Sequence, residues 1–122
     1  MVSGYRDLDI YKLAVQVHDD LEVLFKDIPK LEEYGLKDQL RRSSASIIAN
    51  IAEGYGRKYY KNDYLRFLTY ARGSCDETRE HILMSKQRNY ASNYNYTKLL
   101  DEVDHLGKML TQFIKSVSGR SN

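Results

Sequence analysis

Hydrophobic residues recur along this chain at alternating intervals of four and three, and this rhythm is the feature that most constrains its fold. The spacing places apolar side chains on one stripe of an α-helix, where they can face a neighbouring helix. No stretch alternates with the period of two that a half-buried strand requires. The sequence therefore predicts an all-α protein. The four successive stripes are Ile10, Ala14, Val17, Leu21, Leu24 and Ile28; Leu36, Leu40, Ser44, Ile47 and Ile51; Tyr64, Leu68, Ala71, Cys75, Thr78 and Ile82; and Leu99, Val103, Leu106, Leu110, Phe113 and Val117.

Three breaks separate these stripes. Pro29 and Gly35 mark the first, and the polar residues 89–96 mark the third. The second lies at Gly54 and Gly56, where a glycine past a helix end can adopt the left-handed cap conformation. Short connections favour an antiparallel up-down bundle of four helices, in one domain that spans residues 1–122. The predicted helices cover roughly residues 8–28, 36–54, 61–88 and 96–117.

The composition of 122 residues, 42% hydrophobic and 30% charged, is that of a globular domain with one core. A single cysteine cannot form an internal disulfide, and the first residues contain no apolar run of the kind a signal peptide needs. No stretch approaches the roughly 20 consecutive apolar residues of a membrane span. We therefore expect a cytoplasmic protein with no membrane partner.

Two predicted helices carry a second stripe of apolar or small residues beside the first. In residues 36–54 this stripe is Ala45, Ile48 and Ala52; in residues 96–117 it is Leu100, Gly107 and Ile114. Self-association would cover these faces and make a homo-oligomer, whereas central burial of the two helices would account for them equally. Asn50 and Glu53 lie within the apolar end of the second segment, where they are candidates for fixing helix register or a subunit interface. The predicted oligomer interface is Ala45, Ile48, Asn50, Ala52 and Glu53.

The formal net charge is only +2, but the basic residues gather in the middle of the chain. Residues 37–72 contain eight basic side chains against three acidic ones. Asp38 precedes Arg42 by one helical turn and should neutralise it. Lys37 and Arg41 have no acidic residue on their own ridge, so they are predicted to form the freer patch.

Residues 55–64, with the sequence YGRKYYKNDY, interleave cations with tyrosines. Cations can hold phosphates while exposed rings stack on unpaired bases, so this stretch is the best candidate for binding nucleic acid. A solvated turn is the alternative, and Tyr64 already belongs to a core stripe. The predicted nucleic-acid-binding residues are Lys37, Arg41, Arg42, Arg57, Lys58 and Lys61.

Features that would indicate catalysis are weak. A di-iron site in a helical bundle needs two Glu-x-x-His motifs, and the sequence offers one, at Glu102 and His105. Cys75 lies on a core stripe, where it should behave as a small buried hydrophobe. Glycines 54 and 56 lack the third glycine and the preceding strand of a dinucleotide-binding loop. We predict no catalytic residue, no metal site and no cofactor.

Three motifs occur together in the middle of the chain: Gln39 to Arg42, Asn50 to Arg57 (NIAEGYGR) and Arg66 to Ser74 (RFLTYARGS). With them the sequence resembles the four-helix-bundle proteins encoded in intervening sequences of bacterial 23S ribosomal RNA genes. The resemblance covers nearly the whole chain, because an amphipathic segment precedes these motifs and another follows them in the family's order.

The resemblance implies a bundle that assembles into a ring-like homopentamer. It also implies kinship with the accessory proteins of diversity-generating retroelements, which bind nucleic acid and a reverse transcriptase through a basic pentameric surface. No enzymatic activity is attached to the family. Ile48 stands where the family usually has proline. Because proline kinks a helix, this replacement should straighten or tighten the second helix. The leading hypothesis is thus a non-catalytic oligomer that binds RNA or DNA, and the alternative is a scaffold for a partner protein.

Overall fold

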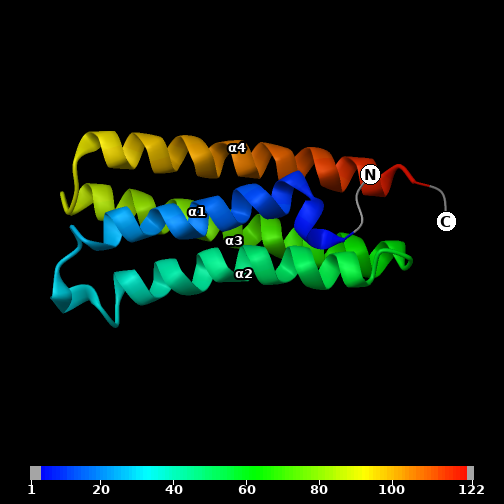
Figure 1. The fold of residues 1–122 in the computed structure, drawn as a ribbon, viewed down its shortest axis with the longest axis horizontal. Coiled ribbons are helices and arrows are strands. Elements are labelled where there is room, and N and C mark those ends of the chain that lie inside the picture. The colour runs from blue at the N-terminus through cyan, green and yellow to red at the C-terminus, as the bar shows by residue number, and fades with distance from the viewer. Residues whose placement is uncertain (1–3, 121–122) are drawn as a thin grey trace.

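A computed structural model describes residues 4–120, and four long helices account for most of them (Figure 1). The helices are α1 (Asp9–Phe25), α2 (Leu36–Gly56), α3 (Lys61–Gln87) and α4 (Asn93–Ser118), with short 3₁₀ turns η1 (Tyr5–Asp7) and η2 (Lys30–Glu32) before α1 and α2. No strand occurs within these residues, so the all-α prediction is confirmed. None of the described helices is long and apolar enough to cross a membrane.

The four helices lie side by side as a bundle in which α1 packs against α2 and α4, and α3 packs against the same two helices. The turn between α2 and α3 lies at the end of the bundle where α4 ends, and the other two connections lie at the opposite end (Figure 1). The predicted stripes form the core. Every stripe residue is buried except Phe113, which is half-buried.

Three predicted helix bounds differ from the structure. The fourth helix begins at Asn93 rather than at 96, and the ends of the first two helices differ for local reasons. We placed the end of the first helix at residue 28, but α1 ends at Phe25. The backbone then tightens into i to i+3 bonds, because Pro29 disfavours the helical conformation of the residue before it. The glycine cap predicted at Gly54 is absent, since α2 continues to Gly56 and no described glycine has a positive φ. A left-handed residue does occur after α3, at Asn89, with φ of 56°.

Gly54 lies inside α2, where the absence of a side chain lets the helix pack closely against α3. A Cβ added there would lie 3.1 Å from the Cβ of Phe67. Hydroxyl pairs continue this contact along the two helices. Thr78 donates to Ser43 over 2.8 Å, and a second pair of the same length joins Ser46 to Ser74.

The contact between α1 and α4 contains two carboxyl groups that face each other. Asp20 on α1 and Glu102 on α4 each have one buried carboxyl oxygen without a hydrogen-bond donor. Burial, together with the neighbouring Asp20, raises the pKa of Glu102 to about 7, while Lys98 and Gln16 act in the opposite direction. A proton shared between the two carboxyls would satisfy both oxygens.

Substituting two glycines should separate helix propensity from close packing. Gly73→Ala adds a Cβ that meets nothing within 4 Å, so it should stabilise the fold by about 0.5 to 1 kcal/mol. Gly54→Ala gains the same propensity but forces α3 away at Phe67, so we expect a net loss of about 1 kcal/mol or more. Urea unfolding of both variants measures the difference, and equal stabilisation would contradict the close contact.

The Glu102 carboxyl should make stability depend on pH. Its folded pKa of about 7 lies above the value of 4.5 that an exposed glutamate has, so the folded state binds the proton more tightly than the unfolded chain. The contribution is fully present below about pH 4.5 and is lost as the pH rises through about 7. Between pH 5.5 and 8 the unfolding free energy should fall by about 1 to 2 kcal/mol, a range discounted for partial exposure.

Glu102→Gln should remove this fall, because the amide donates to Asp20 at every pH. Asp101→Asn, which neutralises the exposed neighbour on α4, serves as the matched control and should keep it. Denaturant unfolding at the two pH values checks both variants. A pH dependence that survives Glu102→Gln would mean that another group carries it.

Candidate nucleic-acid interface

The six predicted cations separate into two groups at opposite ends of α2. Lys37, Arg41 and Arg42 lie in its first two turns, whereas Arg57, Lys58 and Lys61 lie at the turn into α3. A helix of 21 residues is about 30 Å long. One subunit therefore does not bring these residues into a single patch, although all six lie within the basic segment of residues 37–72.

Acidic partners neutralise most of the group at the start of α2. Arg42 pairs with Asp38 at 3.6 Å, as predicted. Arg41 was expected to be free, and this is wrong: a guanidinium nitrogen donates to Glu33 over 2.6 Å. That hydrogen bond raises the pKa of Arg41 and lowers that of Glu33. Helical ridges could not reveal Glu33, because it lies outside α2 in the connection before it.

The other group forms a surface around the α2–α3 turn, which we call the turn surface: Tyr55, Arg57, Lys58, Tyr59, Tyr60 and Lys61. Tyr59 is 84% exposed and Tyr60 71%. The ammonium of Lys58 donates to the Tyr55 hydroxyl over 3.0 Å and lies 4.1 Å from the centre of its ring. This hydrogen bond raises the pKa of Lys58. The nearby Tyr64 is buried in the core, where burial raises its pKa to about 12.

A network of charges holds Arg57 in place. Its guanidinium lies 3.2 Å from Glu53 and 3.9 Å from Asp63, and 5.0 Å from the ring centre of Phe67. Arg66 shares both Asp63 and the Phe67 ring, at 3.4 Å and 5.1 Å. The arrangement fixes the direction of both arginines, and Arg57 lines a hollow of about 420 Å³. It also offsets part of their charge.

The chain's C-terminal end adds a residue that the sequence reasoning missed. Lys61 donates to the main-chain oxygen of Arg120 over 2.7 Å, so the end of α4 lies against the start of α3. Arg120 is 59 residues away along the chain. Helical periodicity carries no signal for a contact over this separation. With Arg66 and Arg120, five cations stand here against the carboxylates of Glu53 and Asp63.

The predicted oligomer-interface residues lie on the outer part of α2. Ala45 and Glu53 are exposed, whereas Ile48 and Ala52 are half-buried. Asn50 donates to the main-chain oxygen and hydroxyl of Ser46, within its own helix. Nothing on these faces distinguishes central burial from self-association, so the interface stays a prediction. The helix is continuous through Ile48.

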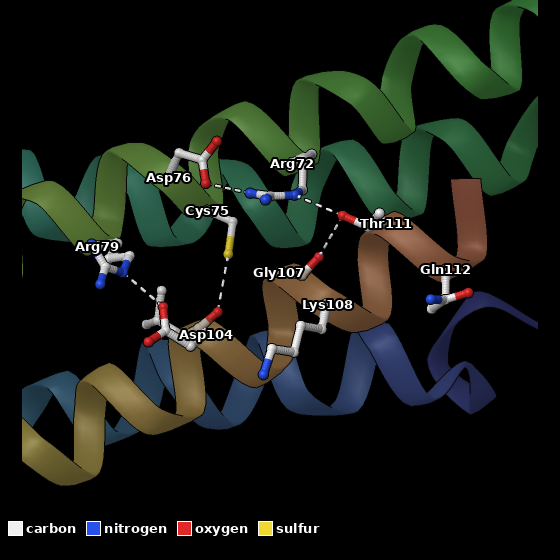
Figure 2. A pocket seen from close by; sticks show the side chains of 10 residues that line it. Arg72, Cys75, Asp76, Arg79, Asp104, Gly107, Lys108, Thr111 and Gln112 are labelled. Carbon is white, nitrogen blue, oxygen red and sulfur yellow. Dashed lines mark hydrogen bonds and ion pairs between the residues drawn. The ribbon is translucent and has the colours of Figure 1, made fainter. Parts of the chain in front are cut away.

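A polar cleft of about 540 Å³ lies between α3 and α4 (Figure 2). Its arginines are paired: Arg72 binds Asp76 and donates to Thr111 over 3.0 Å, and Arg79 donates to Asp104 over 2.7 Å. Cys75 points across the cleft floor toward the main-chain oxygen of Val103, 3.5 Å from its sulfur.

The cleft therefore presents little free charge and no activated nucleophile. Burial raises the pKa of the Cys75 thiol to about 11. Across residues 4–120, no group of three or more His, Cys, Asp or Glu side chains could hold a metal ion, and His105 itself is exposed.

Comparison with known proteins identifies relatives of this fold. The family described as 23S rRNA-intervening sequence protein matches residues 6–112. The crystal structure of a protein of unknown function from the S23 ribosomal protein family of Bacteroides thetaiotaomicron is similar, with a TM-score of 0.77 and 21% identity. The match covers 87% of this chain and 98% of that one. None of the curated proteins matches the sequence.

The burial of Cys75 predicts a slow thiol. At pH 7.5 the native protein should react with a thiol reagent at least 100-fold more slowly than the denaturant-unfolded chain, because the thiolate is scarce and the sulfur is covered. Absorbance of the released chromophore measures both rates. Comparable rates in the two states would mean that the cleft exposes a reactive sulfur.

Proposed function

The chain belongs to the family of 23S rRNA-intervening sequence proteins, and from this premise we propose that it is a non-catalytic, cytoplasmic oligomer that binds RNA or other nucleic acid through the turn surface. In this proposal the bundle is antiparallel and assembles into a homo-oligomeric ring. The observation that carries the proposal is a pair of exposed tyrosines, Tyr59 and Tyr60, standing beside Arg57, Lys58 and Lys61 on one short turn.

The chemistry of this surface suits an unpaired or structured nucleic acid. Ammonium and guanidinium groups contact phosphates, and an exposed tyrosine ring offers a face on which a base can stack. The turn is anchored at both ends. Lys58 packs on Tyr55, and Arg57 is held by Glu53 and Asp63, so the cations are oriented before a ligand arrives.

One subunit supplies only a few phosphate contacts, and oligomerisation would multiply them. In a ring, several copies of the turn surface would act on one strand, and the effective concentration of the second contact would raise the overall affinity. The cations at the start of α2 contribute less in this view, because Glu33 and Asp38 already neutralise Arg41 and Arg42.

A scaffold for a partner protein is the second candidate, and the pairing of Arg57 favours it. Because carboxylates offset part of the positive charge, the exposed tyrosines are the most prominent feature of the turn surface. Tyrosine is enriched among the residues that contribute most to binding at protein interfaces. Such a scaffold would have no intrinsic affinity for nucleic acid. Its complex with the partner would survive nuclease treatment and would be lost in Tyr59→Ser with Tyr60→Ser.

Binding to structured ribosomal RNA should weaken steeply with salt. Each phosphate contact contributes about 0.7 to 0.9 to the slope of log affinity against log salt, so the turn surface predicts a slope of several units. Arg57→Glu with Lys61→Glu should abolish binding at moderate salt without changing helicity or oligomer mass. Fluorescence anisotropy across a salt series measures affinity and slope.

The matched control reverses two cations at the other end of α2, Lys37→Glu with Arg42→Glu. It should lower affinity by less than threefold, since those residues lie outside the turn surface. Tyr59→Ser with Tyr60→Ser should weaken binding at least tenfold while leaving the slope unchanged, because stacking involves no counterion release. Absence of binding at low salt would reject the nucleic-acid proposal in favour of the scaffold.

A further inference from the structure

The connection before α2 presents two large hydrophobic side chains to solvent. Leu31 is 93% exposed and Tyr34 95%, more than any other large hydrophobic residue in the described part of the chain. Leu31 lies in η2 and Tyr34 follows it, in a turn where i to i+3 backbone bonds join Glu32 to Pro29, Glu33 to Lys30 and Gly35 to Glu32. In a turn of this kind, side chains three residues apart project on the same side. We call this pair the η2 knob.

Side-chain contacts hold the knob in this exposed position. Glu32 binds Arg88 and accepts a 2.9 Å hydrogen bond from the Tyr90 hydroxyl, so the turn is attached to the end of α3. Glu33 accepts from Arg41 on α2 over 2.6 Å. The carboxylates of Glu32 and Glu33 both bind side chains of the bundle. The two apolar side chains on either side of them are therefore left facing solvent. Single exposed hydrophobic residues are common, but a fixed pair on one turn indicates a contact.

A groove of about 760 Å³ lies at the other end of the molecule, between the start of α1 and α4. Leu8 and Ile10 from the chain entering α1 line it on one side, and Met109 and Phe113 from α4 line it on the other. Leu8 and Ile10 are buried, and Met109 and Phe113 are half-buried. The α1–α4 groove is mostly apolar and has the size of a pocket for a compact apolar group.

The knob cannot fill the groove of its own chain. Residues 30–34 follow α1, whereas the groove lies where α1 begins, and α1 is 17 residues long, or about 26 Å. The connection before α2 and the start of α1 lie toward opposite ends of the bundle (Figure 1). Each copy therefore offers one knob and one groove that only other molecules can use.

We propose that Leu31 and Tyr34 of one copy insert into the α1–α4 groove of the next copy. The inference deepens the oligomeric part of the proposed function and does not depend on nucleic-acid binding. A contact between two different surfaces of the same chain is heterologous, so repeating it closes a ring or extends a filament. It also assigns a self-association surface outside the small-residue stripe of α2.

A second copy is favoured over an unrelated partner because the chain carries both halves of the contact. The charges beside them are also compatible. Lys30 flanks the knob, and Asp9 lies at the groove. The Lys30 ammonium thus has an opposite charge available on the neighbouring copy, which would help to fix the orientation of docking.

Light scattering on purified protein at a concentration on the order of 10 µM tests the contact. The unaltered chain should have the mass of several chains. Leu31→Ser with Tyr34→Ser removes the knob, and Met109→Lys places a charge in the groove; each should reduce the mass to one chain. An equimolar mixture of the two variants should recover the mass of two chains, because one knob and one groove remain intact.

The matched control is Val23→Ser with Tyr94→Ser. It removes an exposed aliphatic side chain and an exposed tyrosine elsewhere on the surface and should keep the original mass. Circular dichroism checks that each variant folds, and Gln112→Arg at the groove rim replaces Met109→Lys if that variant loses helicity. A monomeric unaltered chain, original masses in the knob and groove variants, or a mixture that stays monomeric would each overturn the inference.

This experiment contains no RNA, so it separates assembly from nucleic-acid binding. Arg57→Glu with Lys61→Glu should retain the original mass. The knob variant should keep a turn surface but bind RNA at least tenfold more weakly, because each molecule then presents one surface instead of several. Loss of RNA binding in a protein of unchanged mass would leave the knob contact standing.

Discussion

The absence of a side chain at Gly54 lets α2 pack directly against Phe67 of α3, next to the turn that joins the two helices. A larger side chain at Gly54 would meet the Cβ of Phe67 at 3.1 Å and separate the helices. Phe67 in turn supports the guanidinium groups of Arg57 and Arg66. The same small residue therefore controls the helix spacing and the direction of two cations at the candidate interface.

The basic residues differ in which groups they pair with, and a count of their charges does not show this difference. Arg41 and Arg42 are matched by acids that lie near the start of α2, whereas Lys58 is held mainly by tyrosine. A count of charges along the sequence treats these cations alike. In three dimensions they differ in how much charge a phosphate would meet, which is why the turn surface carries the functional proposal.

The core could be predicted from the sequence because burial follows the helical period so closely. Only Phe113 among the stripe residues is half-buried. Helix ends were less predictable. A glycine can mark either a helix cap or a site where two helices pack closely, and Gly54 is a site of close packing. Contacts between distant segments, such as Arg41 with Glu33 or Lys61 with Arg120, have no periodic signal, so the candidate site was recovered only in part.

The extensive pairing of α2 with α3 across a turn of only four residues has a consequence for the order of folding. Closing a short loop costs little chain entropy, and contacts between neighbouring segments form faster than those between distant ones. The α2–α3 hairpin is therefore the natural nucleus. The first and last helices, which must meet across almost the whole chain, dock onto it afterwards. The tyrosine-bearing turn would then be among the earliest parts of the molecule to take its native form.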